Sequence, residues 1–171
     1  MNNPEACIFD LDGVIVETTD AHFKAWQRLA ESLGISFGDE FNEQLKGVGR
    51  RASIGKILAL DDRELPENEI QRLMDKKNDW YQDFIAELTL NHILDGVPNF
   101  LETLQEMNIP MGIGSSSKNA SYIIDCLQLN DSFGVIIDGN KVENTKPDPE
   151  VFLKGARVLD ADPSKTIVFE D

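Results

Sequence analysis

The sequence has few positive charges and no long hydrophobic run. Its 171 residues include 16 Lys and Arg against 31 Asp and Glu, a formal net charge of −15. Nucleic acids and anionic membrane surfaces bind basic patches, so this charge argues against both as partners. No apolar run approaches the length that spans a bilayer, so a membrane-embedded protein is not expected. No internal repeat or low-complexity segment is present either.

Cysteine is also scarce, because the chain contains only Cys7 and Cys126. Both lie among apolar residues, which favours small buried thiols over a disulfide or a metal site. The first five residues, 1–5, lack the basic and apolar regions of a signal peptide. We therefore expect a cytoplasmic protein in a reducing compartment.

The most informative segment is Cys7–Val14, an apolar run that ends in two acids and a glycine. The apolar residues predict a short buried strand, and Gly13 allows the chain to turn. Asp10 and Asp12 would then lie at the carboxyl end of a strand, where open α/β sheets bind ligands. Two acids separated by a single residue repel each other, which favours a bound divalent cation. On this segment alone, a plain strand-to-turn sequence or the start of a calcium loop remains an alternative.

The rest of the chain predicts an α/β fold, in which a parallel sheet core carries a helical insert after the first strand. Residues 17–90 contain helical signals without a convincing strand and form the expected insert. Residues 1–16 and 91–171 form the expected core. Further strands are expected at 109–114, 133–137 and 166–169. Helices are expected at 20–33, 40–46, 53–60, 66–88, 99–107, 119–127 and from 146–149 to 159.

Polar groups follow or adjoin the ends of these strands, and the topology should bring them to one edge of the sheet. They are Asp10 and Asp12, Ser115 to Asn119, Lys146, and Glu170 with Asp171. Singly, a serine run, a lysine before proline and a terminal Glu-Asp pair are ordinary surface features. Together they predict an oxygen-rich cation site beside a phosphate site.

This combination is typical of phosphoryl transfer, which needs a nucleophile, charge neutralisation and a proton shuttle. Asp10 is the predicted nucleophile, forming an aspartyl-phosphate. Mg²⁺ and Lys146 would neutralise charge, and Asp12 would serve as general acid and base.

The four segments also resemble, in order, the motifs of the haloacid dehalogenase superfamily of phosphotransferases. They are Asp10–Val14, Ser115–Asn119, Lys146–Pro149 and Glu170–Asp171. This resemblance implies a Rossmann-like parallel sheet with a small helical cap. The insert resembles the cap of the β-phosphoglucomutase family, which interconverts β-glucose 1-phosphate and glucose 6-phosphate through a bisphosphate. The matching cap segments are Asp20–Trp26, Phe41–Val48 with Arg50 and Ser53, and Lys76–Asp79.

The resemblance implies a role for each matching residue. Asp10, Asp12, Glu170 and Asp171 match the Mg²⁺ site, to which Asp12 contributes its backbone carbonyl. Ser115 and Lys146 match the clamp on the transferring phosphate. Positions matching the distal phosphate site are Arg50, Ser117, Lys118 and Asn119. Positions matching the sugar site or the moving cap are His22, Trp26, Gly47, Val48, Ser53, Lys77 and Asn78.

The residue patterns support these cap roles unequally. A guanidinium at Arg50 suits a bidentate grip on phosphate. His22 lies on an apolar helix face, so it could be either a core histidine or a functional one. If it is functional, it could pair with the region around Lys24. Trp26 suits plain packing. Lys77 and Asn78 lie on what otherwise predicts a solvated helix face.

Two departures from the family pattern stand out. The link after the first strand is Val16-Glu17-Thr18, where relatives usually have Thr-Asp-Thr or similar, and relatives continue beyond Glu-Asp with a helix and a fifth strand. We expect the fourth strand to form an exposed sheet edge, and Asp171 to be a frayed metal ligand. Members of the family are expected to be monomers, whereas here either the frayed Asp171 would weaken Mg²⁺ binding or the exposed edge would favour association.

Three functions follow from this reading. The leading one is a mutase acting on β-glucose 1-phosphate. The nearest alternative is a sugar-phosphate phosphatase of the same superfamily, whose cap lacks a second phosphate grip and admits water. A third is a truncated, non-catalytic relative that binds sugar phosphate or associates through its edge. A response-regulator receiver also phosphorylates an aspartate, but the insert after the first strand argues against it.

Overall fold

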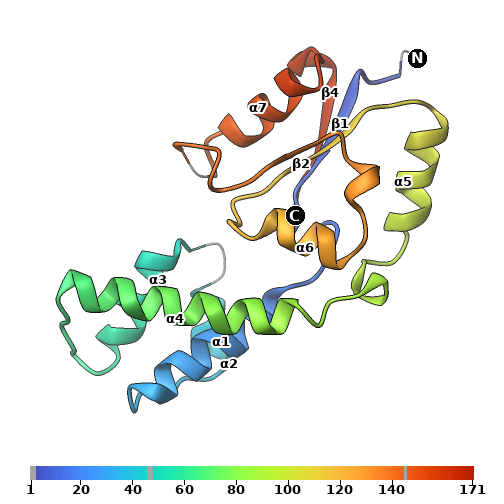
Figure 1. Cartoon of the computed structure of the whole chain (residues 1–171). Coiled ribbons are helices and arrows are strands. Elements are labelled where there is room, and N and C mark those ends of the chain that lie inside the picture. Colours follow the sequence, from blue (N-terminus) through green and yellow to red (C-terminus); the bar gives the residue numbers. More distant parts are fainter. Residues whose placement is uncertain (1–2, 46–47, 145) are drawn as a thin grey trace. The chain divides into compact units, whose positions relative to one another are not determined.

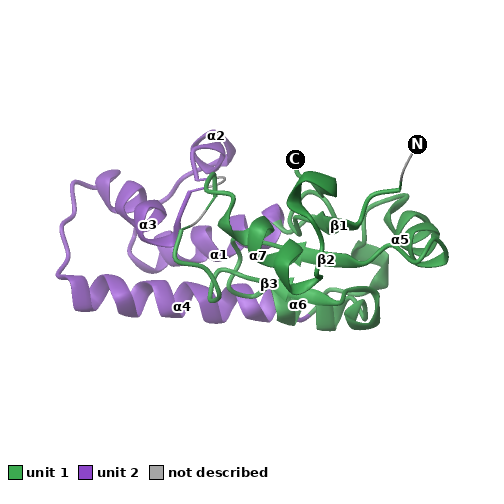
Figure 2. Ribbon diagram, turned by 90° about the horizontal axis from the view of Figure 1, so that it is seen from above, with its two compact units in different colours: residues 1–18, 87–171 green, residues 19–86 purple. Residues whose placement is uncertain are grey.

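The computed structural model describes residues 3–45, 48–144 and 146–171. The chain divides into two compact units, coloured separately in Figure 2. Unit 1 comprises Met1–Thr18 and Glu87–Asp171, and unit 2 comprises Thr19–Ala86. The domain boundaries expected after residues 16 and 90 lie close to these junctions.

Unit 1 is built on a parallel sheet of four strands in the order β3-β2-β1-β4. The strands are β1 (Ala6–Phe9), β2 (Met111–Gly114), β3 (Val135–Ile137) and β4 (Thr166–Phe169). Phe9 pairs in register with Ile113 of β2 and with Phe169 of β4. The residues that follow these strands therefore emerge at the same edge of the sheet. The α/β prediction is confirmed.

Helices cover both faces of this sheet (Figure 1). The helices of unit 1 are α5 (Val97–Glu106), α6 (Ala120–Cys126) and α7 (Glu150–Val158), with short 3₁₀ turns at η1 (Leu90–His92), η2 (Asn130–Ser132) and η3 (Pro163–Lys165). On one face, α7 lies so close to β1 that a Cβ added to Gly155 would be 2.9 Å from Ile8 Cδ1. On the other, Phe100 of α5 meets the ring of Phe9 edge-on at 6.1 Å. Neighbouring residues of β1 therefore anchor opposite helices, as the alternation along a strand requires.

In the described part of unit 2, the regular secondary structure consists of helices. Its helices are α1 (Thr19–Ser32), α2 (Asp39–Glu43), α3 (Arg50–Ala59) and α4 (Glu67–Ile85). Gly34 ends the first helical segment at a positive φ of 77°, and Pro66 occupies the N-cap of α4. The apolar faces form one core, whose buried members are Trp26, Leu29, Ala30, Ile35, Leu45, Ile54, Ile57, Leu58, Ile70 and Met74. The absence of strands expected for the insert holds for the residues described.

Two boundaries in unit 2 differ from the prediction. The helix expected from residue 53 starts earlier, because Gly49 is its N-cap and α3 begins at Arg50. The helix expected from residue 20 begins at Thr19, so Asp20 lies in its first turn. An acid there still suits the positive end of the helix dipole.

Both cysteines are free thiols, and Cys7 is buried whereas Cys126 is only partly buried.

Among the described strands, β4 lies at one edge of the sheet, and its Ile167 and Val168 side chains are 46% and 41% exposed. Within the described part of the chain, no helix has both the length and the apolar character needed to cross a bilayer.

Candidate active site

The first site element is the turn that follows β1. Asp10 continues the strand, its N–H donating to the carbonyl of Phe169 at 2.9 Å, and its side chain is buried. Gly13 then turns the chain with a φ of 79°. A Cβ on Gly13 would lie 2.6 Å from Asp171 Oδ2, so glycine is needed here both for conformation and for space.

Three carboxylates and one ammonium meet at this edge of the sheet. Asp10, Glu170 and Asp171 each offer an oxygen, and these oxygens lie within 4.8 Å of one another. We call them the carboxylate cluster. Lys146 Nζ lies 2.7 Å from Asp10 Oδ1 and 2.8 Å from Glu170 Oε2. Like charges at this spacing repel, and Lys146 balances part of that charge, so the cluster could also hold a divalent cation, since carboxylate oxygens are the ligands that Mg²⁺ prefers.

Asp12 is set apart from that cluster. Its carboxylate accepts a short hydrogen bond from Thr18 Oγ1. Burial is the largest influence on this carboxyl and raises its pKa to about 6, against the lowering effect of the Thr18 bond. The charges of Asp10 and Glu17 also raise this pKa, and Lys146 lowers it. A carboxyl that titrates near neutrality can both give and accept a proton.

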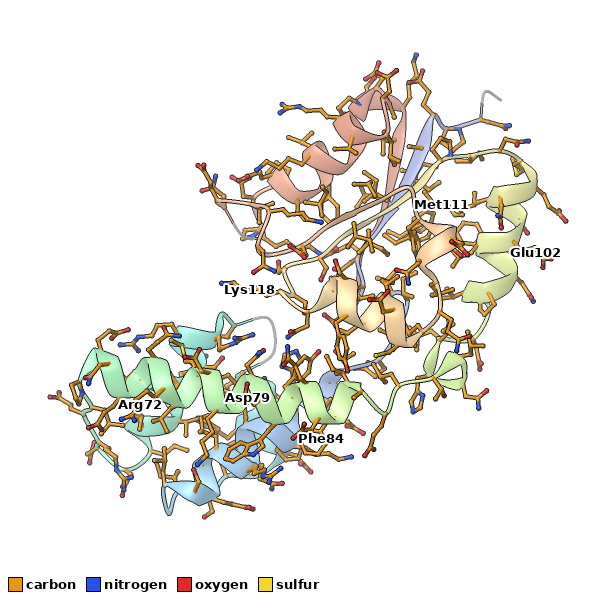
Figure 3. All side chains as sticks on the ribbon, viewed as in Figure 1. Arg72, Asp79, Phe84, Glu102, Met111 and Lys118 are labelled. Carbon is orange, nitrogen blue, oxygen red and sulfur yellow. The ribbon has the colours of Figure 1, made fainter. Side chains whose placement is uncertain are left out.

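The serine loop between β2 and α6 forms the other side of the site. Ser115 is buried, and its N–H donates to Ile137 of β3 at 3.0 Å. Its Oγ accepts the N–H of Ser117 at 3.0 Å, and Ser117 Oγ accepts the N–H of Asn119, the N-cap of α6, at 3.2 Å. Lys118 projects outward from this loop (Figure 3). The loop therefore presents hydroxyls and one ammonium close to a helix start.

In unit 2, His22 and Lys77 form a pair. Lys77 is only 1% exposed, and its Nζ lies 2.8 Å from His22 Nδ1. The prediction that Lys77 lies on a solvated helix face is therefore wrong. The suggestion that His22 pairs near Lys24 is also wrong. Burial is the main cause that lowers the pKa of His22 well below its usual value, followed by the charges of Lys77 and Arg50. The imidazole is therefore neutral and accepts a hydrogen bond from the ammonium.

Aromatic rings surround this pair. Lys77 Nζ lies 4.7 Å from the Trp26 ring centroid and 4.6 Å from that of Tyr81. Tyr81 also stacks on His22 at 4.1 Å. Cation–π contacts of this kind offset part of the cost of burying an ammonium. Trp26 is 5% exposed and packs in the core, as its position on the helix predicts.

The remaining cap residues lie around α3. Arg50 Nη2 donates to Asn78 Oδ1 at 2.9 Å, and burial lowers the pKa of its guanidinium. Ser53 is buried and its Oγ donates to the carbonyl of Val48 at 3.2 Å. Gly47 lies outside the described residues. Arg50 at the start of α3 is therefore hydrogen-bonded to Asn78 of α4, and Ser53 binds the backbone just before α3.

Sequence reasoning missed one group that binds a site residue and one buried acid at the end of a neighbouring strand. Thr18 binds the carboxyl of Asp12, although it lies in a link without periodicity. Asp138, a buried acid directly after β3, accepts the N–H of Asn140 at 2.9 Å. Its only signal was the turn composition of the Asp-Gly-Asn segment.

The comparisons with known proteins agree with this geometry. The family model for haloacid dehalogenase-like hydrolases matches residues 7–171. The chain belongs to this family. It is 41% identical to β-phosphoglucomutase of Bacillus subtilis over 169 residues, which cover 98% of the chain and 75% of that protein. The structure of β-phosphoglucomutase from Clostridium difficile, 40% identical, matches with a TM-score of 0.88 over 98% of this chain and 76% of that one.

A phosphatase also lies among the similar proteins. The phosphorylated carbohydrates phosphatase of Thermotoga maritima is 31% identical over 98% of this chain and 76% of its own length. Family membership therefore establishes a haloacid dehalogenase-like enzyme fold. Mutase and phosphatase relatives share it.

Proposed function

We propose that the chain is a β-phosphoglucomutase that interconverts β-glucose 1-phosphate and glucose 6-phosphate through an aspartyl-phosphate and a bisphosphate. The choice of a mutase rests on the 41% identity to β-phosphoglucomutase of Bacillus subtilis, and the observation that supports phosphoryl transfer is the division between the two acids after β1. Asp10 is ion-paired to Lys146 at 2.7 Å, whereas the pKa of Asp12 is raised to about 6. Carboxyl groups whose environments separate them in this way suit a nucleophile and an acid–base catalyst.

In the proposed reaction, an Asp10 oxygen attacks phosphorus and the bond to the sugar oxygen breaks. Asp12 donates a proton to that leaving oxygen, and in the return step it removes the proton from the attacking hydroxyl. Lys146 and Ser115 hold the phosphoryl oxygens. Lys146 is suited to this because its ammonium already lies against the nucleophile.

The carboxylate cluster fits a magnesium ion. Asp10, Glu170 and Asp171 would supply its side-chain ligands, and the backbone carbonyl of Asp12 a further oxygen. When bound, Mg²⁺ supplies charge neutralisation at the transferring phosphoryl group.

Further residues are proposed to bind the sugar and its second phosphate. Arg50, Ser117, Lys118 and Asn119 are assigned to the second phosphate on the strength of the resemblance. The sugar or cap movement is assigned to His22, Trp26, Gly47, Val48, Ser53, Lys77 and Asn78. A second phosphate grip separates mutase from phosphatase, since it retains the bisphosphate for the second transfer. We propose a cytoplasmic enzyme whose partner is a small sugar phosphate.

The test compares two products from β-glucose 1-phosphate in the presence of Mg²⁺ and a trace of bisphosphate. One coupled assay follows glucose 6-phosphate, and the other follows inorganic phosphate. The mutase proposal predicts that glucose 6-phosphate dominates. Dominant phosphate release favours the phosphatase alternative, which the Thermotoga maritima relative supports. No turnover by this chain favours the non-catalytic alternative.

A further inference from the structure

The segment between β3 and α7 packs tightly on the serine loop. We call residues 138–144 the brace segment. A Cβ added to Gly139 would lie 2.4 Å from the backbone oxygen of Ser116, a closer approach than side chains tolerate. Asn140 Nδ2 also donates to the carbonyl of Lys118 at 3.0 Å. Any shift of the brace segment therefore displaces the serine loop.

The other end of the brace segment is held by one carboxylate at the start of α7. Glu150 Oε1 accepts the N–H of Glu143 at 3.0 Å, and Oε2 accepts the N–H of Asn144 at 2.8 Å and its side-chain amide at 3.0 Å. Lys154 Nζ lies 2.6 Å from Oε1 and also donates to the carbonyl of Lys141 at 2.9 Å. Four donors thus converge on a single carboxylate.

We call these hydrogen bonds to the Glu150 carboxylate the Glu150 clasp. The clasp lies close in the sequence to Lys146, the lysine proposed to bind phosphate. Asn144 is two residues before Lys146, whose ammonium lies 2.7 Å from Asp10 Oδ1. We propose that Glu150 is a positioning residue, which holds the brace segment and so fixes Lys146 on one side of the phosphate site and the serine loop on the other. The inference rests on the proposed function, in which these groups bind the transferring phosphate.

The clasp requires a carboxylate rather than any polar side chain. All four groups that face Glu150 are donors, and an amide at this position would turn its own NH₂ toward some of them. Hydrogen bonds from Lys154, then from the backbone of Glu143 and of Asn144, lower the pKa of Glu150 to about 2. It is therefore charged throughout the pH range in which the enzyme would act.

A simpler role is also available to this residue. Glu150 is in the first turn of α7, where an acid stabilises a helix through its dipole. That role predicts a loss of stability alone. The positioning role predicts a loss of turnover that the stability of the fold does not explain.

The experiment compares Glu150→Gln with Glu102→Gln in the full chain. Glu102 is an exposed acid of α5, on the outer side of the unit (Figure 3). We expect Glu150→Gln to lower kcat about 10- to 100-fold, with a smaller change in KM, because small displacements of catalytic groups have effects of this size. Glu102→Gln should behave as wild type. Glu150→Asp, which keeps the charge, should recover part of the lost kcat.

Two readouts do not depend on turnover. Amide exchange at Glu143 and Asn144 should become faster in Glu150→Gln than in Glu102→Gln, and the affinity for inorganic phosphate with Mg²⁺ should fall about tenfold. If the wild type has no mutase activity but amide exchange and phosphate affinity still change in Glu150→Gln, the positioning role is retained and the mutase proposal is rejected. Unchanged kcat, or a lower melting temperature with unchanged exchange and phosphate affinity, would overturn the proposal.

Discussion

Replacing Asp12 by asparagine separates proton transfer from the rest of the site. The substitution is nearly isosteric, and the asparagine oxygen can still accept the hydrogen bond from Thr18. The side chain of Asp12 is not in the carboxylate cluster, so the proposed side-chain ligands of Mg²⁺ remain in place. The variant therefore removes the acid and base while leaving the nucleophile Asp10 intact.

The expected loss follows from that single function. General acid–base catalysis contributes about 10²- to 10⁴-fold, which corresponds to about 2.7 to 5.4 kcal/mol of barrier height. We expect kcat for glucose 6-phosphate formation in Asp12→Asn to fall by this factor. The apparent Mg²⁺ affinity and the melting temperature should stay near the wild-type values.

The assay follows glucose 6-phosphate from β-glucose 1-phosphate at saturating Mg²⁺, with Asp20→Asn as the matched control. Asp20 is an exposed acid in the first turn of α1, and its replacement should leave kcat unchanged. Wild-type kcat in Asp12→Asn would refute the acid–base role. A large loss accompanied by a lost Mg²⁺ response would refute the assignment of separate roles to the two acids.

Three further predictions concern other parts of the chain. Burial lowers the pKa of His22, so between the unfolded value of about 6.5 and the lower folded value the unfolded chain binds the extra proton, and the free energy of unfolding decreases as the pH is lowered through this range. Denaturant unfolding from pH 7 to 5 should show wild type losing up to about 1.4 kcal/mol per pH unit relative to His22→Gln, with His92→Gln tracking wild type. Gly139→Ala forces a Cβ against the Ser116 carbonyl, and should lower the free energy of unfolding by about 1–3 kcal/mol in the same assay; unchanged stability would mean that this contact relaxes freely. Lys146→Gln removes the ammonium beside the nucleophile, and should lower kcat about 10²- to 10³-fold in the coupled assay; wild-type kcat would exclude it from the phosphate clamp.

The sheet and its functional edge follow closely from the sequence. The expected strand at 166–169 coincides with β4, and the apolar run before Asp10 forms β1. Both are short apolar runs closed by acidic residues, a local signal that tertiary contacts do not alter. Because parallel strands end together, the acids after β1 and β4 lie at one edge of the sheet, where Asp10, Glu170 and Asp171 form the carboxylate cluster.

Features that depend on distant partners could not be predicted in this way. Lys77 lies in a polar stretch of α4, and its ammonium contacts Trp26 and His22 of α1, which are distant in the sequence. The start of α3 was missed because Gly49 suggests a break, whereas it serves as the N-cap before Arg50. Neither outcome has a periodic signal in the sequence.

The central claim is that Asp10 takes the phosphoryl group. It is tested most directly by mixing the chain with Mg²⁺ and β-glucose 1,6-bisphosphate, digesting at acid pH and locating the phosphate by mass spectrometry. Asp12→Asn should be included because it should slow the return step and so retain the phosphoenzyme. The account predicts phosphate on the peptide that contains Asp10, and none on that peptide in Asp10→Asn. Phosphate on another residue, or an Asp10→Asn variant that still turns over, would contradict it.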